Sequence, residues 1–242
     1  MADYLTIDVY DRPPGGPRRW GRDLRSALLQ NIPGLKAVTI NHSNHLTHAL
    51  APMSVIRPGR ALIAAWDSPE SALDAFRGPL ASAVAAPGRY SLDGEVARVR
   101  FEEPNNHWYG WIPSDEGSRP MSADEPLAVI VHGILKPRNL PGFFRNNMHA
   151  ASRAAFHPGH RGSVDVSSKL PFEHTSVSLW GTTKLARDYA YAPGGHAYAM
   201  QHARSNHTHK VGVYLQVRPL ASSGSLGLDS DAFPDLPPAA RQ

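Results

Sequence analysis

The sequence contains no cysteine among its 242 residues. This absence excludes a disulfide framework, a thiolate-ligated haem, an all-cysteine iron–sulfur cluster and a zinc site built on CxxC pairs. Any metal that the protein holds must therefore be bound by histidine, carboxylate, tyrosine or methionine. Histidine is the abundant candidate, with 13 residues.

Long hydrophobic runs are missing as well. No stretch approaches the ~20 apolar residues of a transmembrane helix, and the N-terminal segment MADYLTIDVYDR lacks the basic and then apolar pattern of a secretory signal. Hydrophobic residues make up 41% of the chain and charged residues 19%, which is typical of a soluble globular protein. We therefore expect a cytoplasmic protein without a membrane span.

Runs of one charge are also absent. The formal net charge is +4, but the basic residues are scattered and are not interleaved with aromatic residues as in a stacking platform. This pattern predicts no nucleic-acid partner. The motifs GxGxxG after a strand, the Walker loop, HExxH and GxSxG are absent too, which leaves nucleotide binding and the common hydrolase chemistries without support.

What the sequence does contain is one order of elements that occurs twice. In each half a strand and an amphipathic helix are followed by two strands, a helix and a closing strand. The first half places strands at 4–10, 35–41, 61–66 and 94–101 and helices at 20–30 and 68–75, the second of them capped by Ser68. The second half places strands at 127–135, 163–168, 175–180 and 211–217 and helices at 140–156, 183–192 and 194–204.

The two halves align most clearly at ALIAAWDSPESALDAF (61–76) and SVSLWGTTKLARDYAY (176–191), where a strand ends in Trp and a capped helix follows. The order β-α-β-β-α-β is the ferredoxin-like unit. One sheet face of each unit stays open and apolar, and packing two such faces together removes that surface from water. The sequence therefore predicts an α+β fold in which two tandem ferredoxin-like repeats form an intrachain pseudo-dimer resembling a dimeric α/β-barrel.

The composition also predicts the boundaries of the repeats. Residues 1–103 form the N-terminal repeat, 104–125 a linker rich in Pro, Gly, Ser and acids, 126–228 the C-terminal repeat and 229–242 a flexible tail. The linker carries Trp108, Tyr109 and Trp111. These aromatic residues favour a plug in one end of the barrel, with a lid over a substrate pocket as the alternative.

The most informative histidine is His196, which follows Pro193-Gly194-Gly195 at the start of the last helix. The same helix shows small and apolar side chains at Ala197, Ala199, Met200 and Ala203. A neutral imidazole on such a face suits the proximal ligand of a haem, although a structural histidine at a helix start has the same spacing.

Four segments in this order resemble the spheroidene-monooxygenase-like family of haem proteins, of the dimeric α/β-barrel superfamily: LAVIVHGILKPRNLPGFFR (127–145), SVSLW (176–180), YAYAPGGHAYAM (189–200) and VGVYLQVRPL (211–220). The resemblance implies a haem in the C-terminal repeat with His196 as the iron ligand. It also implies oxygen-dependent chemistry. The chain departs from the family pattern at SNHTHK (205–210), where an aromatic residue is usual.

Because the first half has no histidine at the corresponding place, we expect one haem per chain. Met200, Phe144 and Arg145 are the further residues expected to contact the cofactor. The cations expected to pair with the haem propionates are Arg145, Lys184, Arg187 and Arg204. His202 is a rival iron ligand, but six residues after His196 it points elsewhere on the helix.

Two further groups of histidines are read as loop residues with a weaker link to function. His42, His45 and His48 follow a strand, and His207 and His209 precede the last strand. Both groups are candidates for the rim of a pocket.

From these observations and the resemblance we expect a haem-dependent, monooxygenase-like oxidoreductase of specialised metabolism. Its substrate is expected to be a small apolar or aromatic molecule, its oxidant O2 or peroxide, and its partners an electron-donor protein and a second copy of the chain as a homodimer. The alternatives are a haem enzyme for dehydration or for N–N or N–O bond chemistry, and a haem-binding or small-ligand-binding module that is no enzyme.

Overall fold

The computed structural model describes residues 1–44, 59–85, 88–103, 106–169, 171–192, 201, 205, 208–227 and 231–239. The N-terminal half consists of β1 (Tyr4–Tyr10), α1 (Pro17–Leu28), β2 (Leu35–Asn44), β3 (Arg60–Trp66), α2 (Pro69–Arg77), the short helix η2 (Ala81–Ala83) and β4 (Tyr90–Phe101). The C-terminal half consists of β5 (Leu127–Leu135), η3 (Pro137–Asn139), α3 (Leu140–Ala155), β6 (His160–Ser167), β7 (Glu173–Trp180), α4 (Thr183–Tyr191) and β8 (His209–Gly224).

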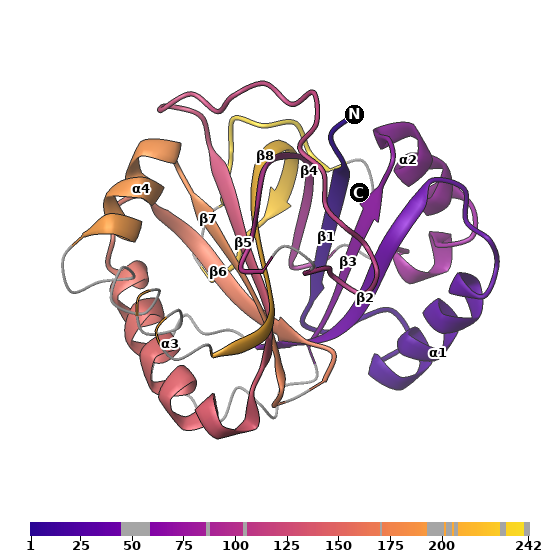
Figure 1. Cartoon of the computed structure of the whole chain (residues 1–242). Coiled ribbons are helices and arrows are strands. Elements are labelled where there is room, and N and C mark those ends of the chain that lie inside the picture. Colours follow the sequence, from indigo (N-terminus) through magenta and orange to yellow (C-terminus); the bar gives the residue numbers. More distant parts are fainter. Residues whose placement is uncertain are drawn as a thin grey trace.

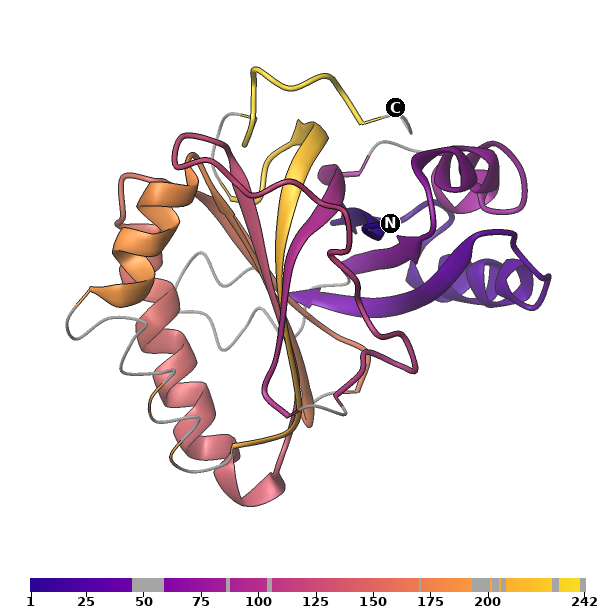
Figure 2. The same ribbon diagram turned by 45° about the horizontal axis from the view of Figure 1, so that its top comes forward.

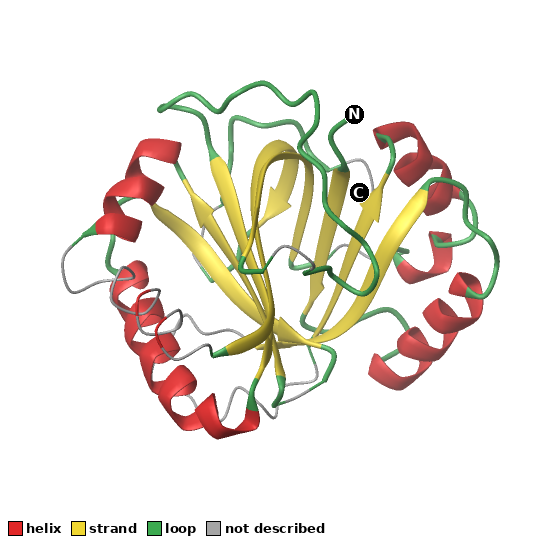
Figure 3. Ribbon diagram, viewed as in Figure 1, coloured by secondary structure: helices red, strands yellow, loops and turns green. Residues whose placement is uncertain are grey.

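These strands form one closed antiparallel barrel in the order β1-β3-β2-β6-β7-β5-β8-β4. Helices α1 and α2 cover the outside of the N-terminal half, and α3 and α4 cover the outside of the C-terminal half (Figures 1 and 3). The α+β fold with two ferredoxin-like repeats joined as a pseudo-dimer is thereby confirmed. The predicted strand at 127–135 is reproduced to the residue, whereas the last strand runs much further than expected, to Gly224.

Two ladders of unequal length join the halves, and Figure 2 shows the sheet from a second direction. β4 and β8 pair from Tyr90–Gly224 to Phe101–Val213. β2 and β6 pair only from His42–Ser167 to Asn44–Asp165.

Apolar side chains fill the inside of the barrel. Residues at every second position of each strand point inward, as the alternation of the sequence predicts. In β8, for example, Val213, Leu215 and Val217 are buried, while Tyr214 and Gln216 lie on the outer face. In the part of the chain that the structure describes, the interior is therefore a packed core.

The linker aromatics close one end of this core. Trp108 and Trp111 are buried among the inward-facing residues, and the ring of Trp108 stacks on His132 with centroids 4.8 Å apart. Trp111 donates a hydrogen bond to the buried carboxylate of Asp3 at 2.8 Å, and the backbone N–H of Ser114 donates to the same oxygen at 2.9 Å. The structure thus shows the plug and not the lid.

Helices α2 and α4 begin at side-chain caps, whereas α1 and α3 have none, and α1 begins at Pro17, three residues before the predicted start. Ser68 accepts a hydrogen bond from the N–H of Ser71 at 3.2 Å at the start of α2, and Thr182 accepts one from Leu185 at 3.2 Å at the start of α4. Each cap follows a strand that ends in Trp, and this places the two helices equivalently in the two repeats. Among the described helices none is long and apolar enough to cross a membrane.

The tail is ordered where the structure describes it. Ala232 and Phe233 are buried against the barrel core, and the N–H of Ala239 donates to Ser223 Oγ at 3.0 Å. The expectation of a flexible segment over 229–242 overlooked these apolar side chains, which gain by covering the barrel. The boundaries at 103/104 and 125/126 remain predictions of the sequence.

The plug yields a test of stability. Replacing a fully buried aromatic residue leaves a cavity, so Trp108→Ala is expected to lower the free energy of unfolding by about 3–5 kcal/mol. Urea denaturation followed by circular dichroism measures this difference. Ile112→Ala, on a side chain that is 68% exposed, serves as the control and is expected to stay within about 0.5 kcal/mol. Equal effects of the two variants would contradict the plug.

Candidate functional site

The main cavity lies outside the barrel, between the C-terminal half of the sheet and the helices α3 and α4. Its volume is about 260 Å³, just below the range of about 300–1,000 Å³ that is usual for small-molecule sites. Outward-facing residues of β4 to β8 form its floor, and one side of each helix forms its roof. The residues that matter below are Arg98, Arg100, Val129, Val131, Asn147, Ala150, Ala151, Ala154, His160, Ser163, Asp165, Ser176, Ser178, Trp180, Ala186, Arg187, Tyr191, Tyr214 and Gln216.

The strand register arranges the floor in two rows that cross five strands. The first row runs through Ser163, Ser178, Val129, Gln216 and Arg98. The second row lies two residues further along each strand and runs through Asp165, Ser176, Val131, Tyr214 and Arg100. Because side chains alternate across a sheet, both rows face the helices. The floor is therefore polar at both edges, with two arginines at the β4 end.

The N-terminal half has the same register but an apolar floor. Trp66 and Trp180 end equivalent strands; Leu35 pairs with Trp66, and His160 pairs with Trp180. By the same register His160, Ser163, Asp165, Ser176 and Ser178 take the places of Leu35, Val38, Ile40, Leu62 and Ala64. Every one of these five polar residues lines the cavity.

Large side chains fill the corresponding space in the N-terminal half. Trp20, Leu24 and Phe76 from α1 and α2 pack there against Leu62 and Trp66. In the C-terminal half the helices contribute the small residues Ala150, Ala151, Ala154 and Ala186, beside Tyr189 and Tyr191 at the end of α4. The cavity thus arises from two changes in one repeat: small residues in the roof and polar residues in the floor.

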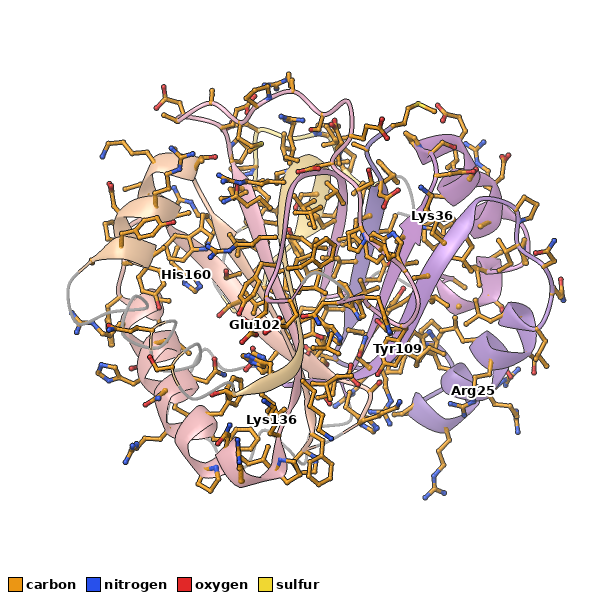
Figure 4. All side chains as sticks on the ribbon, in the orientation of Figure 1. Arg25, Lys36, Glu102, Tyr109, Lys136 and His160 are labelled. Atoms are coloured by element: carbon orange, nitrogen blue, oxygen red, sulfur yellow. The ribbon has the colours of Figure 1, made fainter. Side chains whose placement is uncertain are left out.

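His160 is the floor residue with the most unusual surroundings. Only 8% of the residue is exposed, its Nε2 has no hydrogen-bond partner among the described residues, and its ring packs edge-on against Trp180 with centroids 5.5 Å apart. Burial, and then the neighbouring His157, lower the pKa of His160 to about 4. The imidazole is therefore neutral at pH 7, and its residue lines the cavity on the helix-facing side of the sheet (Figure 4).

A carboxylate stands at the far end of the second row. Asp165 Oδ2 lies 3.3 Å from His174 Nε2 and accepts a hydrogen bond from Asn147 Nδ2 at 3.1 Å. The ring of Phe143 covers His174 edge-on at 4.9 Å. Asp165 and Asn147 both line the cavity, so this carboxylate reaches the cavity while His174 and Asn147 lie within hydrogen-bond distance of it.

The roof is held by a side chain of α4. The hydroxyl of Tyr189 donates to the carbonyl oxygen of Ala150 at 2.6 Å, which ties α4 to α3. Burial, partly offset by Arg153, raises the pKa of Tyr189 to about 12, so the hydroxyl stays protonated and keeps donating at neutral pH. Arg187, on the same helix, lines the cavity and is exposed to solvent.

Several residues predicted for the site lie outside the described residues: His196, Met200, His202 and Arg204. Phe144 and Arg145 are exposed on α3 and do not line the cavity, because the cavity-facing positions of this helix begin at Asn147. Their contact with a cofactor stays a prediction. Lys184 is exposed and pairs with Asp188 at 2.8 Å, so of the four predicted cations Arg187 is the one that the described structure places at the cavity.

The histidines expected in loops have other places. His42 belongs to β2, and its Nδ1 lies 2.9 Å from Arg60 Nη1. His209 begins β8, where its Nδ1 lies 3.0 Å from Glu102 Oε2 and its ring occupies the space above Gly133. Neither lines the cavity, and both strands extend beyond the predicted ends because ladder pairing continues there. His45, His48 and His207 lie outside the described residues.

The sequence did not point to the residues of the floor. Alternating Ser and Val in a strand has the pattern of a solvent-facing surface, and the glycines of GHRGS at the start of β6 are typical of a turn. Only the comparison with the aligned first half could have shown that apolar positions had become polar. No group of three or more His, Cys, Asp or Glu side chains suited to a metal ion occurs among the described residues.

No protein family and no curated protein matches the sequence. A crystal structure of aldoxime dehydratase matches with a TM-score of 0.56 and 10% identity, over 90% of this chain and 80% of that one. An aldoxime dehydratase in complex with butyraldoxime matches with a TM-score of 0.54 and 11% identity, over 90% of this chain and 78% of that one.

A proposed monooxygenase from Fusobacterium nucleatum covers 95% of this chain and 98% of its own, with a TM-score of 0.41 and 10% identity. At such identities the similarity shows the fold alone. The fold agrees with the superfamily that the sequence resembles. Membership of the spheroidene-monooxygenase-like family stays a proposal.

The buried imidazole of His160 predicts a dependence of stability on pH. In the unfolded chain its pKa returns to about 6.5, so between pH 6.5 and 4 the unfolded state binds more protons than the folded state. The free energy of unfolding is therefore expected to fall as the pH drops through this window. At pH 4.5 this one group accounts for about 2–3 kcal/mol.

The measurement is urea denaturation at pH 7.0 and 4.5. His160→Gln is expected to lose about 2–3 kcal/mol less than the wild type between these two pH values. His149→Gln, on an exposed residue of α3, is expected to follow the wild type. If the profile of His160→Gln runs parallel to that of the wild type, the imidazole is not held neutral by burial.

Proposed function

We propose that the protein is a haem-dependent enzyme acting on a small molecule, with the cavity beneath α3 and α4 as its site. The main observation that supports this proposal is a difference between the repeats. Five floor positions that hold apolar residues in the N-terminal repeat hold polar residues in the C-terminal repeat. Burying a hydroxyl, carboxylate or imidazole in place of a leucine lowers stability unless the group gains a partner. A ligand in the cavity supplies such a partner, so these residues favour a function over a purely structural role.

The described residues include the types of side chain that a haem site requires. A haem needs a slot between apolar surfaces, a nitrogen ligand and cations for its propionates. The alanines of α3 and α4 offer the apolar surface, and Arg187 offers a cation on α4. The predicted ligand His196 follows the cavity-lining residue Tyr191 by five positions in the sequence, and His160 offers a second neutral imidazole.

In this proposal each part of the chain has a role that its chemistry supports. A bound haem supplies an iron that activates O2 or peroxide. The alanine roof excludes water, and Ser176, Ser178 and Gln216 orient a substrate through hydrogen bonds from the floor. Asp165, next to His174, is placed to accept a proton at its carboxylate.

The polar floor also favours a second candidate within the same class. Hydroxyl, amide and guanidinium groups suit a substrate with heteroatoms better than a hydrocarbon. The two aldoxime dehydratases with this fold act on such a substrate. Dehydration of a nitrogen–oxygen compound at the same site is therefore the alternative to oxygen transfer.

The first test is the absorbance spectrum of the protein purified after expression with added haem. A Soret band is expected, and His196→Ala is expected to lose it, because the iron then has no proximal nitrogen. His202→Ala and His160→Ala are the matched controls and are expected to keep it. Loss of the band in one of these controls, with His196→Ala retaining it, would move the ligand to that residue, and a protein that takes up no haem would refute the proposal.

A second test restores the apolar pattern of the N-terminal repeat. Ser176 corresponds to Leu62, so Ser176→Leu is expected to fill the cavity, to keep or raise stability by about 1 kcal/mol, and to lower haem uptake at least tenfold. Ser176→Ala, which leaves the space open, is expected to keep at least half of the haem. Absorbance titration measures the uptake and thermal denaturation the stability. If both variants bind haem like the wild type, the cavity is not the site.

A further inference from the structure

Arg98 and Arg100 stand side by side at the β4 end of the two floor rows. They are two residues apart on one strand, so their backbones are about 7 Å from each other and both side chains point to the same face. Both line the cavity, and Arg98 lies opposite Gln216 while Arg100 lies opposite Tyr214 in the register. No carboxylate of the described residues forms an ion pair with either guanidinium.

The fold does not require arginine at these two positions. Both side chains are exposed at the outer face of β4, beyond Glu95, where the pairing of β4 with β1 ends. Arg218, by contrast, is buried and bound to Glu95 and Glu125, as a structural arginine is expected to be. Arg218 thus serves the fold, whereas Arg98 and Arg100 are left for a ligand.

The charges around the cavity also favour an anionic ligand. Among its described lining residues are three guanidinium groups, on Arg98, Arg100 and Arg187, and one carboxylate, on Asp165, which gives a net charge of +2. His174 and Asn147 already bond to the carboxylate, at the opposite end of the second row. A cleft with an excess of one charge concentrates ligands of the opposite charge.

We propose that the cavity binds a small amphipathic carboxylate, with its anionic group on Arg98 and Arg100 and its apolar body against Val129 and Val131 at the centre of the floor. Paired guanidinium groups bind carboxylates through short, charge-assisted hydrogen bonds. The two valines accept the rest of the molecule, and the alanine roof remains the surface for the haem of the proposed function. This inference rests on the proposed function for the location of the site. It specifies the substrate as an anionic molecule with an apolar body, where the sequence predicted an apolar or aromatic molecule.

The test compares two molecules of one shape, 2-naphthoate and 2-naphthamide, which differ in the charge of the head group. Both are titrated into the full-length protein at pH 7.5, and binding is followed by their fluorescence and by calorimetry. Naphthoate is expected to bind at least tenfold more tightly than naphthamide. Raising NaCl from 0.05 to 0.5 M is expected to weaken naphthoate several-fold and to leave naphthamide unchanged, because salt screens the guanidinium charges.

Variants assign the preference to the two arginines. Arg98→Gln/Arg100→Gln is expected to bring naphthoate down to the affinity of naphthamide, and Arg98→Lys/Arg100→Lys to restore part of the difference. Arg12→Gln/Arg22→Gln removes the same charge from exposed residues in the N-terminal half and is expected to bind like the wild type. Equal binding of the two molecules, or a naphthoate preference that survives in Arg98→Gln/Arg100→Gln, would overturn the inference.

The haem content of every sample separates this inference from the proposed function. A colourless protein that prefers naphthoate through Arg98 and Arg100 supports the carboxylate site and refutes the haem. A haem-loaded wild type without the preference refutes the carboxylate site alone. If Arg98→Gln/Arg100→Gln loses its Soret band and keeps the naphthoate preference, the two arginines serve the haem propionates and the inference is wrong.

Discussion

Closure of the sheet is the constraint on which the other features of this protein depend. A closed barrel leaves no strand edge for a ligand or partner to pair with, and here its inside is filled by side chains from every strand and by two tryptophans of the linker. Among the described residues, the space for chemistry lies between the outside of the sheet and the helices. The repeats supply two such interfaces, and the amino acids at equivalent register positions decide which of them becomes a site.

The two interfaces divide stability and binding between them. In the N-terminal half, tryptophan, leucine and phenylalanine side chains fill the space between helices and sheet. Each such side chain contributes about 1.5–3 kcal/mol when fully buried. In the C-terminal half, alanines and serines bury less apolar surface, and His160 adds a desolvation cost. The well-packed half can thus compensate for the half that holds the cavity.

The sequence predicted the elements well because their signals are local. Alternating apolar residues, the caps Ser68 and Thr182, and the tryptophans that end β3 and β7 each act within a few residues. The site was predicted poorly because it depends on register between distant strands. Ser163 and Ser176 look like surface residues until β6 and β7 are paired and α3 and α4 are placed above them. The burial of His160 could not be predicted without its pairing with Trp180. The packing of the tail over 231–239 could not be predicted without the barrel that the tail covers.

The covalent joining of the repeats has a consequence for how such a site can evolve. In a homodimer of identical subunits every substitution is made twice, so a serine or an aspartate that opens a cavity weakens both interfaces at once. A gene fusion removes this symmetry. One copy can then accumulate destabilising polar residues while its twin keeps the ancestral packing, so that a single asymmetric pocket becomes accessible to selection.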